Sequence, residues 1–492
     1  MMRRSPHALI RNAIGGKLRQ ALLLCFCLLQ VGGLAKAEPL SQAEALAALP
    51  ARSVTGVGGK TVSSLNLSEY RALLVPELVP LVRSGRLEFD AMQRLHFDWR
   101  YDERWYVDVD VRRRSLTGGK LAAIPNGVPG LVAIPPFLGT KAGPPGAESE
   151  SSEAKLKAGS EALWAAVSAN WSQGGFRSDF ELLSFNKESV ERGTFGTILR
   201  VYPGILKESE GTGQVFRELL KFTSPPPFDR LRWLSFRFLG DDEDIVWIFS
   251  PAIGQARQLT GSNRSDRLFP RSISADDLLG WSGKPERTIP EYDRSIVALV
   301  PFPSHLLTEA SSEPNGCFAV ENGVGTAEPR FNLDAQRFST SAPWLPTRWV
   351  WTPRTLHRIV LTSNDPYALH GRQVVYLDDQ SLLPVVRVVY SRAGRYLRTL
   401  ISSFGLAQSP KGDRKFWYPA TTLIEDDETG QFLAVDYRKT QVCDRLVPEL
   451  QSPEFDPRKL GQPPEVPGVA SSPASSTAVP LLTPAAEELP ND

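Results

Sequence analysis

The sequence predicts a mainly β protein with a few short helices, an α+β fold whose main element is an antiparallel sheet. Three observations predict it. Runs rich in branched and aromatic residues are dense between residues 104 and 438. Short polar turns separate many of these runs, and few stretches have the apolar spacing of a helix.

The predicted strands follow one another from the middle of the chain towards its C-terminal end. They are residues 104–111, 194–202, 231–239, 245–250, 255–260, 295–301, 356–361, 372–377, 385–390, 395–402, 416–424 and 432–438. Polar turns at 240–244, 378–383, 391–394 and 426–430 join neighbouring strands. Strands this close form hairpins, because a parallel crossover takes a dozen or more residues. The sheet is therefore predicted to be antiparallel.

Several predicted strands are apolar on both sides, unlike those of an antiparallel sheet with one face in water. Leu234 and Phe236 point to one side of their strand and Trp233 to the other, while Val388 and Val389 oppose each other on theirs. Both faces of the sheet must therefore be covered. Helices can cover one face; the other can meet a second sheet or curve around an apolar cavity.

Helical patterns are found at residues 41–49, 65–83, 160–171 and 275–279. Pro76 and Pro80 are expected to kink or split the second helix. The third carries apolar side chains at helical spacing, which predicts packing onto the sheet. The fourth is indicated by a capping box that begins at Ser274 and by a stop at Gly280.

The first 37 residues have the order of a cleavable signal peptide. Basic residues up to Arg19 precede an apolar run of 14 residues, 21–34, and small-x-small residues follow, with cleavage expected after Ala37. A transmembrane helix takes roughly 20 residues, so a retained anchor is the weaker alternative. Cys25 follows a leucine where a lipoprotein signal has a small residue. We therefore expect a mature protein released into the periplasm of a bacterium.

Two further stretches are too poor in large apolar residues to pack. Residues 139–159 are rich in Gly, Pro, Ser, Glu and Lys and predict a disordered loop. Residues 453–492 are rich in Pro, Ala and Ser and predict a disordered tail. The folded part is then a β-rich domain over residues 38–452.

The charge balance gives no reason to expect nucleic acid as a partner. The chain has 56 Lys and Arg against 55 Asp and Glu, and the signal peptide holds six basic residues and no acidic one, so 50 basic residues remain against 55 acidic, a net charge of −5. Nucleic acids are bound mainly through clustered Lys and Arg.

The predicted mature chain keeps two cysteines, Cys317 and Cys443, which are 126 residues apart. In an oxidising compartment such an isolated pair most often forms a disulfide. The competing interpretation is two buried thiols.

The sequence contains no recognisable enzyme motif. The segment from Gly280 to Gly283 lacks the spacing of a nucleophile elbow, and no phosphate-binding or dinucleotide loop follows a predicted strand. The histidines and cysteines show no metal-binding spacing. We expect no catalysis, no cofactor and no metal.

The segment 233–284 resembles a bacterial family of unknown function that is described as similar to outer-membrane lipoprotein-sorting proteins. The pattern is a strand, an acidic turn, a tryptophan-centred strand ending in proline, a basic strand and a short helix, here at 236–239, 241–244, 247–251, 257–259 and 276–278. Residues 357–404 resemble the family's later hairpins, and 130–137 and 163–171 match more loosely. Where relatives have Gly-Ser-Asp before the short helix, this chain has Pro270-Arg271-Ser272.

The resemblance implies the fold of the LolA and LolB lipoprotein carriers: a strongly curved antiparallel sheet, an incomplete barrel, that helices close over an apolar cavity for acyl chains. It also implies association with inner-membrane pumps of the resistance-nodulation-division superfamily and with outer-membrane proteins. A lipid in water exposes apolar area at a cost of roughly 25 cal/mol per Å². A carrier must therefore offer a dry concave surface.

We accordingly expect a carrier or adaptor that binds a hydrophobic or lipid-like ligand non-covalently. Its cavity would be lined by Phe236, Phe238, Trp247, Phe249, Val375 and Val388, and the competing interpretation for each of these residues is ordinary core packing. Arg257 and Arg271 can bind a lipid phosphate or a partner carboxylate, or form surface ion pairs. The alternative is a structural or interaction protein of the cell envelope without a ligand cavity.

Overall fold

A computed structural model describes residues 39–50, 60–92, 151–171, 175–185, 190–202, 214–226, 228–238, 240, 242–268, 273–303, 307–321, 349–412, 415–443 and 455–462. The predicted signal peptide, its cleavage site after Ala37 and the strand predicted at 104–111 lie outside these residues.

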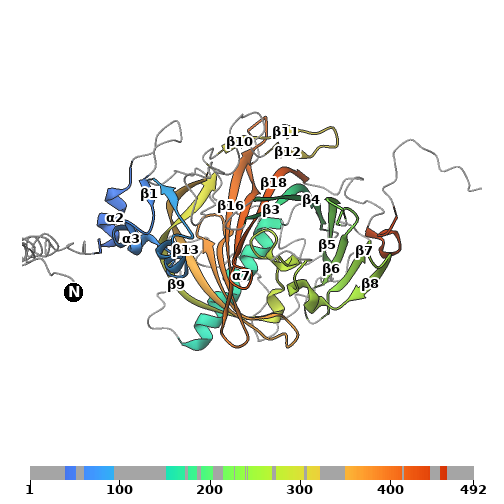
Figure 1. Ribbon diagram of the computed structural model, residues 1–492, viewed down its shortest axis with the longest axis horizontal. Helices are drawn as coiled ribbons and strands as arrows, with labels where there is room; N and C mark the ends of the chain where they lie inside the picture. The colour runs from blue at the N-terminus through green and yellow to red at the C-terminus, as the bar shows by residue number, and fades with distance from the viewer. Residues whose placement is uncertain are drawn as a thin grey trace, which may run out of the picture.

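Thirteen strands pair antiparallel in one continuous sheet (Figure 1). In spatial order they are β9 (Thr288–Pro303), β13 (Trp349–Ser363), β14 (His370–Asp378), β15 (Pro384–Ser391), β16 (Tyr396–Gln408), β17 (Lys415–Asp426), β18 (Gln431–Cys443), β3 (Gly175–Phe185), β4 (Val190–Val201), β5 (Gln214–Ser224), β6 (Arg232–Phe238), β7 (Ile245–Ser250) and β8 (Gln255–Leu259). The mainly β, antiparallel fold is thus confirmed.

Five shorter strands extend this sheet: β1 (Lys60–Val62), β2 (Phe89–Ala91), β10 (Leu307–Glu309), β11 (Ser311–Ser312) and β12 (Phe318–Glu321). β1 pairs with β2, which meets β13 at Ala91. β10 runs parallel to β16, and β12 joins β11 to the outer part of β18.

The predicted strands that fall within the described residues are confirmed, and so are the four hairpin turns. Several strands are longer than expected. β9 and β13 pair with each other past the end of the short β14–β15 hairpin, and so do β16 and β17. β3 and β5 were not predicted.

The N-terminal helices are α2 (Gln42–Ala48), α3 (Leu67–Tyr70) and α4 (Val79–Arg83), with 3₁₀ turns η1 (Arg71–Leu73) and η2 (Pro76–Leu78) between α3 and α4. Ser41 and Glu44 cap α2 reciprocally. Pro76 and Pro80 occupy the first turns of η2 and α4, so the prolines divide the predicted helix as expected.

The third predicted helix is longer than the sequence indicated. α7 spans Ser152–Trp171, so the last part of the predicted loop 139–159 is helical; its earlier residues lie outside the described ones. Residues 153–158 are mostly good helix formers, and Ala158 is buried against the sheet. At Gly159 an added Cβ would lie 2.6 Å from the carbonyl oxygen of Pro290 in β9, so a glycine allows this close approach.

The predicted disordered tail also begins with ordered structure. Residues 455–462 contain the 3₁₀ helix η10 (Pro457–Lys459), and Phe455 and Leu460 are buried against Phe249 of β7. These two buried apolar side chains hold the segment against the sheet, although the residues around them are mostly polar. Residues 463–492 lie outside the described part of the chain.

Two faces of the sheet carry separate apolar cores. One, here called the α7 face, packs against α7 at β9, β13 and β14 and against residues 261–268 and 273–284 farther along the sheet. The opposite face is covered by the N-terminal segment 60–92 at one end and by residues 455–462 at the other. Figure 1 shows the blue N-terminal helices and the green strands β5–β8 at opposite ends, with α7 (teal) between them.

The sheet curves around the α7 face. β15 and β6 are seven strands apart in the pairing order, which is about 34 Å on a flat sheet at roughly 4.8 Å per strand. Yet Arg387 of β15 donates to the carbonyl oxygen of Asp276, whose carboxylate binds Arg264, which in turn donates to Ser235 of β6. A few side chains therefore span the distance. The strongly curved sheet that the resemblance implied is present.

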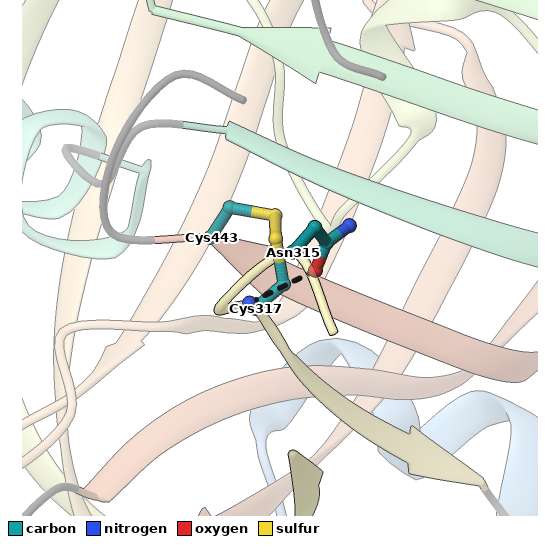
Figure 2. Close-up of a disulfide and its surroundings, with 3 residues drawn as sticks. All are labelled: Asn315, Cys317 and Cys443. Carbon is teal, nitrogen blue, oxygen red and sulfur yellow. Dashed lines mark hydrogen bonds between the residues drawn. A yellow bond between two sulfur atoms is a disulfide. The ribbon is translucent and has the colours of Figure 1, made fainter. Parts of the chain in front are cut away.

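The predicted disulfide joins Cys317 and Cys443, with the two Cα atoms 4.4 Å apart. Cys443 ends β18, and Cys317 precedes β12, where its N–H donates to the side chain of Asn315 at 3.0 Å (Figure 2). The bridge therefore holds the edge strands β11 and β12 to the main sheet.

Candidate ligand-binding site

The six residues expected to line an apolar cavity lie in separate places. Phe236, Trp247 and Phe249 belong to one cluster on the opposite face, together with the segment 455–462. Phe238 lies half-buried two residues beyond Phe236.

Val375 and Val388 lie on different faces because of the strand register. Val375 pairs with Arg387, and Val388 pairs with Val374. Cross-strand partners share a face, so Val375 packs under α7 and Val388 packs against the N-terminal segment. The six residues therefore do not form one cavity wall, a point that composition and alternation alone leave open.

The structure describes one of the two arginines that were expected at a head group or partner. Arg257 is exposed on β8. Arg271 lies outside the described residues.

A different set of charged side chains gathers on the α7 face. Glu218 of β5 is fully buried and binds two guanidinium groups: Arg200 of β4, with its Nε at 2.9 Å, and Arg264 of the loop after β8, with its Nη1 at 3.1 Å. Arg264 also donates from Nε to Asp276 at 3.0 Å and from Nη1 to Ser235 at 2.7 Å.

The short turn η6 (Ala275–Asp277) supplies the second half of this network. The carboxylate of Asp277 accepts from the backbone N–H and hydroxyl of Ser274, so the capping residues are in contact as expected. It also pairs with Arg387 at 3.0 Å and Arg398 at 3.1 Å, from β15 and β16. One acidic turn therefore caps itself and fixes the loop to the sheet.

Arg237 of β6 holds the end of the same loop. Its Nε pairs with Asp244 at 2.5 Å, and its two terminal nitrogens donate to the carbonyl oxygens of Ser282 and Gly283 at 3.1 and 2.9 Å. Residues 261–268 and 273–284 are thus tied to β4, β5, β6, β15 and β16 by buried charge.

The pKa directions follow from this pairing. Burial alone raises the pKa of Glu218, but the guanidinium groups of Arg200 and Arg264 outweigh it and hold the pKa at about 2. Burial raises the pKa of Asp276, and its arginine neighbours only partly offset this. Burial lowers the pKa of His370 to about 3, with the cations Arg387 and Arg398 acting in the same direction.

A polar pocket of about 50 Å³ opens beside this network. Its lining comes from β6, the turn before β7, the loop 261–284, the β13–β14 turn and the start of β14, including Arg264, Asp276, Trp281, Asp365 and His370. Sequence reasoning did not single out these residues as a site, because charged residues in strands and loops usually face solvent. The resemblance of segment 233–284 was the one signal that pointed to this part of the chain.

Within the described residues, no group of three or more His, Cys, Asp or Glu side chains is placed to hold a metal ion. In the same part of the chain, no helix is both long and apolar enough to cross a membrane.

No family model matches the sequence, and no curated protein is significantly similar to it. Solved structures match over more than half of the chain. A putative outer membrane lipoprotein-sorting protein domain from Vibrio parahaemolyticus matches with 15% identity and a TM-score of 0.42, over 62% of this chain and 100% of that one.

Two further structures match in the same way. A DUF1329 family protein from Desulfovibrio piger has 13% identity and a TM-score of 0.37, over 57% of this chain and 91% of the other. A LolA superfamily protein from Nitrosomonas europaea has 13% identity and a TM-score of 0.33, over 60% and 95%. At these values the likeness says nothing about ligand, partner or site residues.

Proposed function

We propose that the protein is a periplasmic carrier or adaptor that binds a hydrophobic or lipid-like ligand non-covalently and assists its transport across the envelope together with an inner-membrane pump and an outer-membrane protein. The observation that carries this proposal is how the sheet is covered. The apolar side chains of β9 and β13–β16 on the opposite face pack against a separate N-terminal segment, residues 60–92. A segment of this kind can give way to an acyl chain while the thirteen main strands stay paired.

The contact between this segment and the sheet is mainly apolar. Phe89 stacks on Trp351 with ring centroids 4.0 Å apart, and Leu78 and Val82 are fully buried. An acyl chain offers the same kind of apolar surface, worth roughly 25 cal/mol per Å² on either partner. Exchange of the segment for a ligand would therefore be close to balanced in hydrophobic free energy.

A small number of polar contacts then decide how firmly the segment is held. Glu77 accepts from Arg358 at 2.8 Å and from the hydroxyl of Tyr376 at 2.5 Å. Arg86 pairs with Glu425. β2 pairs with β13 through Ala91, and the N–H of residue 92 donates to the carbonyl of Trp351 at 3.0 Å.

Glu77→Gln tests this arrangement. The variant removes a half-buried charge that pairs with Arg358 on the sheet, so the segment is held less firmly. We expect a severalfold increase in affinity for a fatty acid such as palmitate, measured by titration calorimetry on the mature protein. Glu69→Gln makes the same change elsewhere in the segment and should bind as the wild type does. Unchanged or weaker binding by the Glu77 variant would contradict displacement of the segment.

A second candidate function is a structural or interaction protein of the envelope without a ligand cavity. It is favoured by the burial of the predicted cavity residues, since Val375 and Val388 are fully buried in apolar clusters. This alternative predicts that the purified protein binds no amphiphile.

A further inference from the structure

Glu77 brings a carboxylate into the apolar contact between the segment 60–92 and the opposite face of the sheet. Its Oε1 accepts from Arg358 Nη2 at 2.8 Å, and its Oε2 accepts from the hydroxyl of Tyr376 at 2.5 Å. The oxygen of Tyr376 in turn accepts from Arg358 Nε at 3.0 Å, so the phenol directs its own proton at the carboxylate. Two donors therefore converge on the two oxygens of one carboxylate.

The two donors belong to the sheet, whereas the acceptor belongs to the segment that the proposed function displaces. Arg358 of β13 and Tyr376 of β14 are cross-strand partners, so they share a face. Asp293 of β9 accepts from Arg358 Nη1 at 2.8 Å and holds the guanidinium group from the other side. None of these contacts involves the segment. The donor pair therefore keeps its place when the segment leaves.

Positive charge remains at this place once Glu77 is removed. Arg372 lies over the ring of Tyr390, with its guanidinium carbon 5.2 Å from the ring centroid. Burial raises the pKa of Tyr390, Glu77 raises it further, and Arg372 and Arg358 lower it, so the three charges lie around the same ring. Without Glu77, these two guanidinium groups and the single carboxylate of Asp293 remain. The site then favours an anion.

A row of apolar residues leads away from the donor pair across the same face. Each member is the cross-strand partner of the one before it: Tyr376, Val386, Ile401, Leu423 and Ala434. All of them are buried in the cluster that packs against the segment 60–92. The row spans four strand spacings, about 19 Å at roughly 4.8 Å per strand, which is comparable with the length of an extended palmitate chain. One ligand can therefore reach the donor pair and cover the row.

The donor pair also lies where a head group would meet water. The side chains of Glu77 and Arg358 are 12% and 13% exposed, whereas the apolar row beyond them is fully buried. A buried ion pair adds little net stability, because the loss of water offsets the attraction between the charges. A ligand carboxylate in place of that of Glu77 keeps the charge and both hydrogen bonds. The exchange therefore leaves no donor unpaired.

We propose that Glu77 is an internal substitute for the head group of the ligand, and that Arg358 and Tyr376 bind the carboxylate of a fatty acid once the segment moves aside. This inference rests on the proposed carrier function and specifies the polar end of its ligand. Arg358 Nη2 and the hydroxyl of Tyr376 donate to the ligand's carboxylate oxygens as they do to those of Glu77. The acyl chain follows the row from Val386 to Ala434.

The test adds Arg358→Gln to the Glu77→Gln variant, in which the internal carboxylate is already absent. Titration calorimetry on the mature protein measures the affinities for palmitate and for cetyl alcohol, its neutral analogue. The ratio of the two affinities is the readout, because further loosening of the segment changes both alike. We expect Glu77→Gln to raise this ratio and the added Arg358→Gln to lower it about tenfold. Arg177→Gln in the same background, at an exposed arginine that pairs with Asp179 on β3, is the matched control and should leave the ratio unchanged.

The other outcomes separate this inference from the proposed function. If Glu77→Gln gains affinity for both amphiphiles equally and Arg358→Gln leaves their ratio unchanged, the head-group site is wrong and the carrier function stands. If neither amphiphile binds the wild type or any variant, both fail. Tighter binding of lysophosphatidylglycerol than of palmitate, with the same loss in Arg358→Gln, would overturn the carboxylate in favour of a phosphodiester. Should the double variant fold poorly, Tyr376→Phe in the same background removes the other donor and is expected to lower the ratio; an unchanged ratio would overturn the site.

Discussion

At the scale of single residues, each buried arginine of the network on the α7 face has a carboxylate partner. Phe216 lies among three guanidinium groups, with the carbons of Arg200, Arg237 and Arg264 at 4.3, 5.0 and 5.8 Å from its ring centroid. Such cation–π contacts and the paired carboxylates together compensate for the loss of water. Removing one partner leaves the others uncompensated.

Glu218→Gln should therefore destabilise the protein strongly. The change leaves Arg200 and Arg264 buried without their shared carboxylate, and breaking a buried pair costs about 3–5 kcal/mol. The free energy of unfolding from urea denaturation at pH 7 measures this loss. Glu243→Gln, at an exposed acidic side chain of the β6–β7 turn, should change the value by less than about 0.5 kcal/mol. Equal free energies of unfolding for the two variants would contradict a stabilising role of the buried ion pairs of Glu218.

His370 predicts a pH dependence of stability. Its pKa is about 3 in the folded protein and about 6.5 when unfolded, so the unfolded chain binds more protons between these values. The stabilisation is present above pH 6.5 and is lost as the pH falls through this window, by about 3 kcal/mol at pH 4. His370→Gln should lose less stability than the wild type between pH 7 and pH 4 in denaturant unfolding. Parallel losses would refute the assignment of this window to His370.

Residue patterns predicted strand positions far better than they predicted burial. Glu218 lies in a strand that was not predicted, because Phe216, Leu219 and Leu220 do not alternate and a glutamate between them suggests a solvated face. Its burial depends on Arg264, 46 residues away, and no local pattern contains that partner.

At the scale of elements, the disulfide attaches an edge to the main sheet. Cys317→Ser with Cys443→Ser should lower the free energy of unfolding by about 4–5 kcal/mol, because the bridge closes a loop of 126 residues in the unfolded chain. Comparison with the reduced wild type separates loss of the bridge from loss of the sulfur atoms. A stability equal to that of the oxidised wild type would exclude the bridge in solution.

Hairpins, capped helices and proline breaks follow from local chemistry, which is why they were predictable here. The start of α7 and the segment 455–462 were not, because each depends on a few apolar side chains reaching a distant strand. The overall composition of a stretch hides a few such apolar residues, so it does not predict that the stretch is ordered.

At the scale of the whole molecule, one curved sheet carries two apolar faces that are covered by segments rather than by a second sheet. The lack of apolar–polar alternation in several strands predicted that both faces are covered. It did not predict which segment covers which face, because that assignment depends on strand register across the whole sheet.

The most direct test of the carrier account is native mass spectrometry of the mature protein purified from the periplasm, combined with extraction and analysis of its lipids. The account predicts a co-purifying amphiphile at close to one molecule per chain, which exchanges with added palmitate. A protein that is free of lipid and that binds no added amphiphile would contradict the account.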